Sequence, residues 1–346
     1  MKAMVLTGAN RPFELMQRPD PKAGPGEAVA RVITCGAGLT IQHVKAGRRK
    51  VQFPRIIGHE ITGEIVETGP GVKGIKAGDA VTVYFYLDCG HCRWCLQNLE
   101  PLCENLGGMV GMDCDGAYAE YVKLPAQNFI KLPAGLDHKK HAAEIGVVTD
   151  ALATPYKVLR RARVAAGETV AVIGAGGGLG IHQVMMANWA RTRVIAVDTK
   201  AGKFDACRKA GADEVVDASA GRVTEQLLEL TKGQGVDVVI DYVSATATLE
   251  AGAKALGRHG RLVTLGGSGK TFQASAVDML YKEQDLLGSR YVTRAEILAT
   301  FELVARREVW PLVTDVRPLG EAEAVHARVE RGEVIGRAAL RVSGRQ

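Results

Sequence analysis

The sequence has no long hydrophobic run and no massed charge of one sign. Its longest uninterrupted apolar stretch, residues 170–181, has 12 residues and is rich in glycine, whereas a membrane-spanning helix needs about 20. The N-terminal residues reach Gly8 without the longer apolar stretch and the cleavage site of a signal peptide. We therefore expect a soluble, cytoplasmic protein with no membrane partner.

Charge and composition exclude further classes. The 44 basic and 38 acidic residues give a net charge of +6, and the basic residues form only short clusters such as 48–50, which are typical of a solvated surface. We therefore expect no nucleic-acid partner. With 47% hydrophobic and 24% charged residues, the chain is an ordinary globular one and not disordered, collagenous or coiled-coil. A length of 346 residues favours two domains.

Four of the seven cysteines crowd into one stretch. Cys89, Cys92, Cys95 and Cys103 are spaced C-x2-C-x2-C-x7-C, and Gly90 lets the chain turn between the first two. Disulfides are disfavoured in a chain without a secretion signal, whereas four thiolates can close a tetrahedral shell around zinc. The spacing predicts a zinc site with no open position for substrate, and hence a structural role.

The pattern of expected secondary structure changes near residue 150. Before it, short β-branched runs at 28–34 and 80–86 are separated by many glycines, which predicts an irregular β domain. After it, strand and helix patterns alternate, beginning with a strand at 168–173 and a helix at 181–189, which predicts a parallel sheet. Further strands are expected at 194–197, 214–216, 236–240 and 261–265.

A glycine-rich loop follows the strand at 168–173. It contains Gly174, Gly176, Gly177, Gly178, Leu179 and Gly180. Glycines let the backbone approach a pyrophosphate at a helix N-terminus. The next strand ends at Asp198, 18 residues after Gly180, where a carboxylate can bind the adenosine ribose.

The acid also indicates which dinucleotide binds. A carboxylate at Asp198 repels a 2′-phosphate, which favours NAD over NADP, although Lys200 weakens this preference. We expect Lys200 beside the cofactor as well. Leu265 and the turn Gly266-Gly267-Ser268-Gly269 fit the nicotinamide end of the same crevice.

These features resemble the medium-chain, zinc-dependent alcohol dehydrogenase superfamily across nearly the whole chain. The matching pieces, besides the cysteines and the glycine loop, are Gly58-His-Glu-Ile-Thr-Gly-Glu-Ile-Val66, Gly116-Ala-Tyr-Ala-Glu-Tyr-Val122 and Asp150-Ala-Leu-Ala-Thr-Pro-Tyr156. The resemblance implies an α/β protein with a GroES-like, β-rich catalytic domain at 1–152 that carries the zinc lobe at 89–103. It also implies a Rossmann domain with a doubly wound parallel sheet at 153–290 and a return to the first domain at 291–346. A homodimer or homotetramer is implied too.

The resemblance also assigns the family's catalytic zinc. Members hold that ion with a Cys, with the His of the Gly-His-Glu motif and with a later Cys or Asp. His59 matches the second ligand and Asp150 the third, while Glu60 matches the acid beside the metal.

The first ligand is where this chain departs from the family. The family usually reads Cys-Gly-Val-Cys-His-Thr-Asp-Leu-His, and this chain reads Cys35-Gly-Ala-Gly38-Leu-Thr40-Ile-Gln-His43. Thr40 and His43 stay in register, so Gly38 stands where the ligand belongs. We therefore favour the absence of a tightly bound catalytic zinc. Two alternatives stay open: Cys35 as the ligand, at the cost of a three-residue shift, or a metal held by His59, Glu60 and Asp150 alone.

The family's proton relay is retained. Thr40 can hydrogen-bond the substrate oxygen and pass a proton through the nicotinamide ribose to His43. His59 and Asp150 can form an acid–base pair in which the carboxylate orients the imidazole. Each of these side chains also has a purely structural explanation, as a helix cap, a surface histidine or an inert cluster.

Two catalytic functions and one non-catalytic function follow. We favour NAD-dependent interconversion of a secondary alcohol and its ketone, with an allylic or thioester-activated substrate to ease the loss of zinc. The alternative is reduction of a conjugated C=C bond by NADH, the chemistry of superfamily branches that lack the catalytic zinc. A protein that only binds NADH would show no turnover. The residues at 48–50 would rim the active-site mouth and could meet an anionic group of the substrate.

Overall fold

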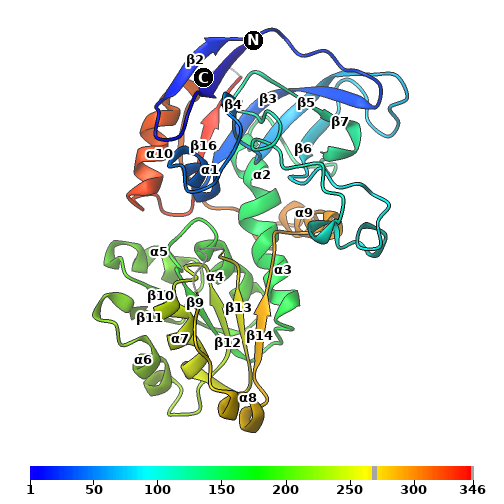
Figure 1. The fold of residues 1–346 in the computed structure, drawn as a ribbon. Coiled ribbons are helices and arrows are strands. Elements are labelled where there is room, and N and C mark those ends of the chain that lie inside the picture. The colour runs from blue at the N-terminus through cyan, green and yellow to red at the C-terminus, as the bar shows by residue number, and fades with distance from the viewer. Residues whose placement is uncertain (267–270, 344–346) are drawn as a thin grey trace. The chain divides into compact units, whose positions relative to one another are not determined.

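The chain folds into two units, each with its own sheets and core. The computed structural model describes residues 1–266 and 271–343, so the predicted turn at Gly267, Ser268 and Gly269 lies outside the described residues. One unit comprises Met1–Asp150 and Thr293–Gln346, and the other comprises Ala151–Val292 (Figure 1). No helix of the described chain is both long enough and apolar enough to cross a membrane.

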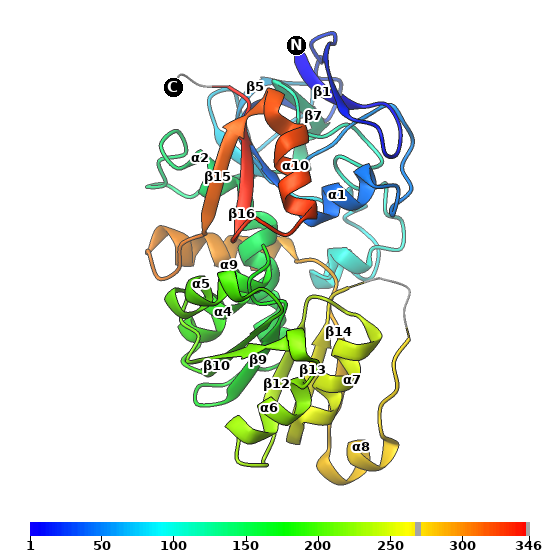
Figure 2. The same ribbon diagram turned by 90° about the vertical axis from the view of Figure 1, so that its left-hand side faces the viewer.

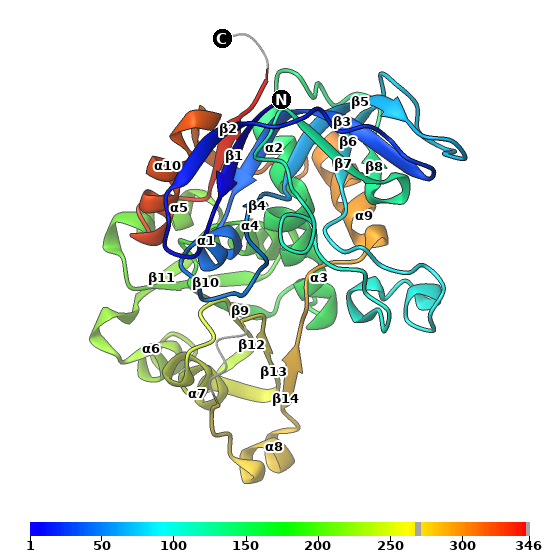
Figure 3. The same ribbon diagram turned by 45° about the horizontal axis from the view of Figure 1, so that its top comes forward.

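The first unit is built mainly from antiparallel strands. Its strands are β1 (Lys2–Leu6), β2 (Phe13–Gln17), β3 (Glu27–Ala37), β4 (Arg55–Ile56), β5 (Ile61–Thr68), β6 (Ala80–Val83), β7 (Tyr121–Pro125), β8 (Phe129–Lys131), β15 (Val313–Pro318) and β16 (Arg337–Arg341). One sheet has the order β2-β1-β4, and Figure 3 shows β1 and β2 side by side. The other has the order β15-β16-β3-β5-β6-β8, with β7 paired to β3.

Helices of the first unit pack on these sheets. They are α1 (Leu39–Lys45), α2 (Ala142–Val147), α9 (Arg294–Ala305) and α10 (Ala322–Glu330). Figure 2 shows α10 beside β15 and β16, the C-terminal strands that join the sheet of β3. The predicted strand at 28–34 is longer than expected and ends at Ala37, while the strand predicted at 80–86 ends at Val83. Tyr84, Phe85 and Tyr86 continue from it as buried aromatic side chains.

The second unit has the predicted parallel sheet. Its elements are α3 (Ala153–Arg161), β9 (Thr169–Ile173), α4 (Gly180–Trp189), β10 (Arg193–Asp198), α5 (Phe204–Lys209), β11 (Glu214–Asp217), α6 (Val223–Leu230), β12 (Val236–Asp241), α7 (Thr246–Ala255), β13 (Leu256–Thr264), α8 (Ala276–Lys282) and β14 (Asp285–Gly288). The strand order is β11-β10-β9-β12-β13-β14 and every pairing is parallel. This is the doubly wound order, whose topological switch lies between β9 and β12.

The strands of this sheet are apolar along their whole length because helices cover both faces. α3, α4 and α5 pack together against one face, and α6 and α7 pack together against the other. Ala171, Ile195, Val239 and Leu262 are buried in the core between the layers. Such continuous apolar strands are expected where both faces of a parallel sheet are covered, and the α/β fold class is confirmed.

Candidate active site

The four clustered cysteines are brought together as predicted. The sulfur atoms of Cys89, Cys92, Cys95 and Cys103 all lie within 4.8 Å of one another. Gly90 has a φ of 74°, a conformation in which glycine is favoured. N–H groups of the backbone, led by that of Cys95, lower the pKa of the Cys92 thiol to about 6, whereas burial raises the pKa of the Cys95 thiol to about 12. Zinc binds the thiolate form of such side chains. This group can hold a structural zinc ion.

The glycine loop of the second unit is as tightly packed as a phosphate-binding turn requires. A Cβ on Gly180 would overlap the carbonyl oxygen of Gly174, and a Cβ on Gly176 would overlap the side chain of Lys203. Gly174 itself has a φ of 79°. The loop then opens directly into α4 at Gly180, so its N–H groups lie at the helix end that attracts phosphate.

Asp198, at the end of β10, braces this loop. Its Oδ2 accepts a hydrogen bond of 2.8 Å from the N–H of Gly176, and its Oδ1 accepts one of 3.0 Å from the N–H of Lys200. An ionised carboxylate has about four lone-pair sites, so both oxygens retain room for a ribose hydroxyl. The carboxylate therefore lies where the sequence predicts.

Lys203 is a residue of this region that sequence analysis missed. Its side chain is buried and packs on Gly176 beside Asp198. Burial lowers its pKa, although the charge of Asp198 acts in the opposite direction. Lys200, the lysine that was named, is exposed. The helical turn that follows Lys200 could have pointed to Lys203, because it carries that side chain back over the loop.

The later cofactor residues lie at the end of β13. Leu265 follows the strand directly, and Gly266 packs so closely on Ser244 that a Cβ would overlap its side chain. The N–H of Gly266 donates to the Ser244 hydroxyl at 2.8 Å. This close packing holds the backbone that follows β13 against Ser244. Leu265 and Gly266 remain predicted cofactor residues.

In the first unit, the predicted catalytic residues His59, Glu60 and Asp150 converge. His59 and Glu60 precede β5, and Asp150 lies in a π-helical turn, Val148–Leu152, a local irregularity often found at functional sites. His59 Nε2 lies 3.7 Å from Asp150 Oδ2, and the ring of Phe85 packs on the imidazole with a centroid distance of 4.3 Å. His59 Nδ1 is buried and has no hydrogen-bond partner in the part of the chain that the structure describes.

A fourth residue, Arg337, completes this cluster and was not predicted. Its Nη2 donates to Glu60 Oε1 at 2.8 Å and to Asp150 Oδ2 at 2.9 Å, while its Nε donates to Glu60 Oε1 at 3.1 Å. Its side chain is 7% exposed and that of Glu60 is 1% exposed. The guanidinium therefore bridges two carboxylates in a nearly water-free site.

The register of the sheet explains why Arg337 reaches this place. β16 pairs antiparallel with β3, with Ala338 opposite Ala37, so the next position sets Arg337 opposite Gly38. Opposed residues place their side chains on the same face of a sheet. Because Gly38 has no side chain, the arginine lies over it. No sequence motif marks Arg337, which is 277 residues from Glu60.

The charges in the cluster influence one another. Burial lowers the pKa of Arg337, but the carboxylates of Glu60 and Asp150 outweigh that effect and raise it above its usual value. Burial raises the pKa of Glu60, and the neighbouring charge of Arg337 only partly opposes this. We therefore treat the guanidinium as a permanent cation, and the surroundings of Glu60 together raise its pKa.

Thr40 and His43 lie on α1, three residues apart and hence on one face of the helix. His43 Nδ1 is buried, and none of the described residues forms a hydrogen bond with it. Burial, and then the charge of Arg48, lowers the pKa of His43. Arg48 is itself held by two hydrogen bonds, of 2.8 and 2.6 Å, to the carboxylate of Glu330, so it does not offer an unpaired charge to an anionic substrate.

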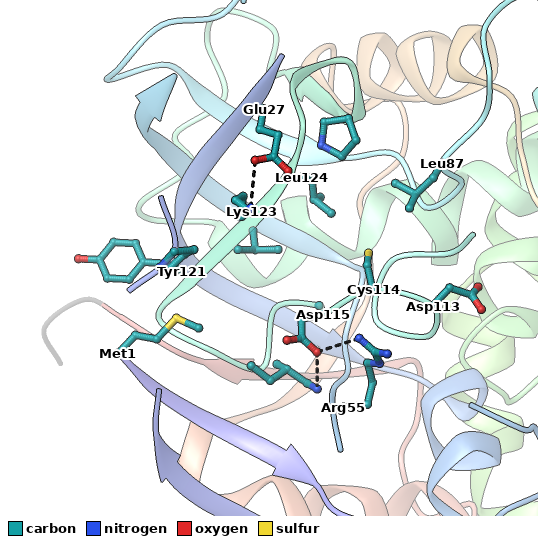
Figure 4. A pocket seen from close by; sticks show the side chains of 15 residues that line it. Met1, Glu27, Arg55, Leu87, Asp113, Cys114, Asp115, Tyr121, Lys123 and Leu124 are labelled. Carbon is teal, nitrogen blue, oxygen red and sulfur yellow. Dashed lines mark hydrogen bonds and ion pairs between the residues drawn. The ribbon is translucent and has the colours of Figure 1, made fainter. Parts of the chain in front are cut away.

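A separate cavity of about 450 Å³ in this unit includes none of these residues. Figure 4 shows four of its charged side chains paired with one another, Glu27 with Lys123 at 3.0 Å and Arg55 with Asp115 at 3.1 Å. Cys114 and Asp113 are also part of its wall. Because this cavity contains none of the predicted catalytic residues, we do not place the reaction there.

Comparison with known proteins identifies the family. Residues 24–134 match the alcohol dehydrogenase GroES-like domain, and residues 178–306 match the zinc-binding dehydrogenase domain. An NAD-dependent alcohol dehydrogenase of Sulfurisphaera tokodaii is 30% identical over 98% of this chain and 99% of its own length. The chain belongs to the medium-chain, zinc-dependent alcohol dehydrogenase superfamily. It is an oxidoreductase of the alcohol dehydrogenase type, with NAD as its cofactor.

Two further members of this superfamily are named for different reactions. The crystal structure of the alcohol dehydrogenase from Aeropyrum pernix superposes with a TM-score of 0.90 at 32% identity, covering 99% of this chain and 100% of that one. An acryloyl-coenzyme A reductase of Metallosphaera sedula is 30% identical over 98% of this chain and 99% of its own length. One relative is thus named for an alcohol and another for a conjugated C=C bond.

The superfamily implies a catalytic zinc, and the residues here do not fit one. Among residues 1–266 and 271–343, the four cysteines are the only set of three or more acidic, histidine or cysteine side chains grouped to hold a metal. His59, Glu60 and Asp150 do not form such a set. Cys35 is fully buried and also lies outside it. The space beside Gly38 is filled by the guanidinium of Arg337.

Proposed function

We propose that this dehydrogenase interconverts a secondary alcohol and its ketone with NAD, without a metal ion on the reacting oxygen. In the oxidation, the carbinol C–H bond breaks and its electron pair and hydrogen pass to NAD⁺ as hydride. The O–H bond also breaks, and its proton passes to a base of the protein. The products are ketone, NADH and a proton, so that atoms and charge balance.

The observation that supports the proposal is the buried pair of His59 and Asp150. Alcohol oxidation needs a base at the oxygen, and an imidazole oriented by a carboxylate is such a base. His59 Nδ1 has no hydrogen-bond partner within residues 1–266 and 271–343, and the other ring nitrogen lies 3.7 Å from Asp150. Thr40 and His43 offer a second route for the proton along α1.

The absence of a metal restricts the substrate. A bound zinc ion lowers the pKa of a coordinated water to about 7, and an alcohol at this site has no such help. We therefore propose an activated alcohol, either an allylic alcohol, whose enone product is stabilised by conjugation, or a hydroxyl β to a thioester. The ring of Phe85, which packs on His59, suits an apolar or cyclic substrate of this kind.

Reduction of a conjugated C=C bond by NADH is the second candidate. The similarity to an acryloyl-coenzyme A reductase favours it. In that reaction hydride adds to the β-carbon and the α-carbon takes a proton, so a base at the oxygen is not required. The buried His59–Asp150 pair would then have no chemical task, which is why we rank this function second.

Product analysis distinguishes the two functions. A cyclic enone is incubated with NADH and the products are separated by gas chromatography, and the matching allylic alcohol is incubated with NAD⁺. Our proposal predicts allylic alcohol from the first reaction and enone from the second, both abolished by His59→Asn. Saturated ketone as the main product would establish the second candidate instead. No product with intact NADH binding would contradict both.

The cellular setting is proposed on the same basis. We expect a homodimer or homotetramer, as the family resemblance implies, and we propose a cytoplasmic location. Sedimentation of the purified protein tests the assembly, and a monomer at micromolar concentration would contradict it.

A further inference from the structure

Arg337 occupies the space in which a side chain at position 38 would lie. A Cβ built on Gly38 would lie 2.9 Å from Cζ and from Nη1 of Arg337 and 3.0 Å from Nη2. These distances are shorter than ordinary side-chain contacts allow, and the arginine cannot retreat without leaving Glu60 and Asp150. Gly38 and Arg337 therefore depend on each other.

The backbone gives no other reason for glycine at this position. Gly38 has a φ of −111° and a ψ of 172°, an extended conformation open to any residue. Its partner on the same face of β3, Gly36, is in a similar situation, because a Cβ there would overlap Oε2 of Glu60. The two glycines together make room for an ion pair, not for a turn.

Formal charges are consistent with replacement of the zinc ion and its cysteine ligand by Arg337 and Gly38. In the family's arrangement the cluster would hold Zn²⁺, a cysteine thiolate and the carboxylates of Glu60 and Asp150, with a net charge of −1. Here it holds the guanidinium and the same two carboxylates, again with a net charge of −1. Losing the thiolate and replacing a divalent ion by a monovalent one thus leaves the electrostatic balance unchanged.

We propose that the guanidinium of Arg337 takes the place of the superfamily's catalytic zinc and holds the substrate oxygen. Nη2 and Nε are used by the carboxylates, whereas Nη1, the nitrogen nearest the position of a ligand side chain at residue 38, makes no hydrogen bond to the described residues. Nη1 is the donor that remains for an oxygen. The substrate in this inference is taken from the proposed function. The replacement of zinc by Arg337 does not depend on that function.

The first experiment exchanges the two residues back and counts zinc. The double variant Gly38→Cys/Arg337→Ala restores a thiolate beside His59 and Asp150 and removes the cation. We expect two zinc ions per chain for this variant by mass spectrometry, and one for the parent, for Gly38→Cys and for Gly38→Ala/Arg337→Ala. Cobalt loading of the first double variant should add a thiolate-to-cobalt absorption band that the others lack.

The controls keep this test decisive. NADH binding and the thermal unfolding midpoint show that each variant is folded, and Gly38→Cys/Arg337→Gln repeats the exchange if the alanine variant aggregates. A second zinc in the parent or in Gly38→Cys alone would overturn the proposal. So would a single zinc in a folded double variant. None of these readings needs a substrate.

The second experiment tests the contact with oxygen. Arg337→Met should lower kcat about 100- to 1000-fold, the usual effect of removing one donor from an oxyanion, and Arg337→Lys should lower it less. The affinity for NADH should not change. Arg341→Ala, which removes an exposed arginine from the same strand, serves as the matched control and should keep full activity. A loss below 10-fold in Arg337→Met would overturn this part.

The two experiments also separate this inference from the proposed function. If the zinc counts follow the expected pattern while no alcohol is turned over, the substrate assignment is wrong and the exchange stands. If alcohols are turned over by a parent that contains two zinc ions, the proposed chemistry stands in a different form and the exchange is wrong.

Discussion

At the scale of single residues, two positions far apart in the sequence determine the centre of this dehydrogenase. The departure at Gly38 is visible in the sequence, since Cys35 before it and Thr40 and His43 after it stay in register with the family motif. The arginine that fills the space is not visible, because its position depends on which residue of β16 lies opposite Gly38. A pattern of residues can thus show that a ligand is missing, but only strand register shows what replaces it.

A side chain introduced at position 38 should lower the stability of the protein only while Arg337 is present. Gly38→Ala forces a methyl group against the guanidinium, and overpacking of this kind typically costs about 1–3 kcal/mol. In Arg337→Ala the same substitution should cost little. The midpoint of thermal unfolding of the four proteins in this double-mutant cycle measures the coupling.

A glycine in open space provides the control for that cycle. A Cβ on Gly202 would meet none of the described residues within 4 Å, so Gly202→Ala should leave the midpoint nearly unchanged. Additive effects of Gly38→Ala and Arg337→Ala would show that the two residues do not depend on each other.

At the scale of elements, the sequence predicts the strands and helices of the second unit closely and those of the first unit only in part. The strands of the second unit are apolar throughout and its glycine loop joins strand to helix, so the pattern at 168–198 defines β9, α4 and β10 within one or two residues. In the first unit the strands that matter most, β3 and β16, pair across about 300 residues of sequence. Neither α1 nor the π-helical turn at Asp150 has a distinctive pattern of its own.

The attachment of α10 predicts a dependence of stability on pH. His326 of α10 is fully buried, and a hydrogen bond of 2.8 Å joins its Nε2 to the hydroxyl of Tyr118. Burial lowers its pKa to about 3. Unfolding below the unfolded-state pKa of about 6.5 therefore takes up a proton, so stability is complete above that pH and falls by about 1.4 kcal/mol per pH unit as the pH drops toward 3.

The variant His326→Gln removes this term and keeps a polar group for Tyr118. Urea unfolding at several pH values from 7 to 4 should give a steeper decline for the parent than for the variant. Parallel declines would mean that His326 is charged in the folded protein.

The cysteine lobe, 89–103, should depend on zinc independently of the reaction. Cys95→Ser opens the cluster, so we expect loss of the bound zinc and faster proteolysis within the lobe, because a structural zinc orders the loop that holds it. NADH affinity should be unchanged. Cys114→Ser, outside the cluster, should retain the metal, and zinc loss from that variant instead would contradict the assignment.

At the scale of the whole molecule, the two units have separate chemical tasks. The Rossmann unit, Ala151–Val292, carries the glycine loop and Asp198, and the other unit carries His59, Glu60 and Arg337. Changes in one unit should therefore alter cofactor affinity, and changes in the other should alter turnover.

Cofactor choice is the prediction that belongs to this division. Asp198→Asn keeps a hydrogen-bonding side chain at the end of β10 but removes the negative charge. Because hydrogen bonds to charged groups contribute about 1.5–3 kcal/mol, we expect NADH to bind at least about tenfold more weakly and its advantage over NADPH to shrink. Fluorescence titration of both cofactors measures this. An unchanged preference would show that Asp198 serves only the loop.

Metal content decides whether an arginine or a metal holds the reacting oxygen. The parent and Cys95→Ser are purified in active form from zinc-rich medium, and zinc per chain is counted by mass spectrometry. We predict one zinc in the parent and none in the variant, because the cysteines hold the only ion. Two in the parent and one in the variant would place a metal at the site that we assign to Arg337.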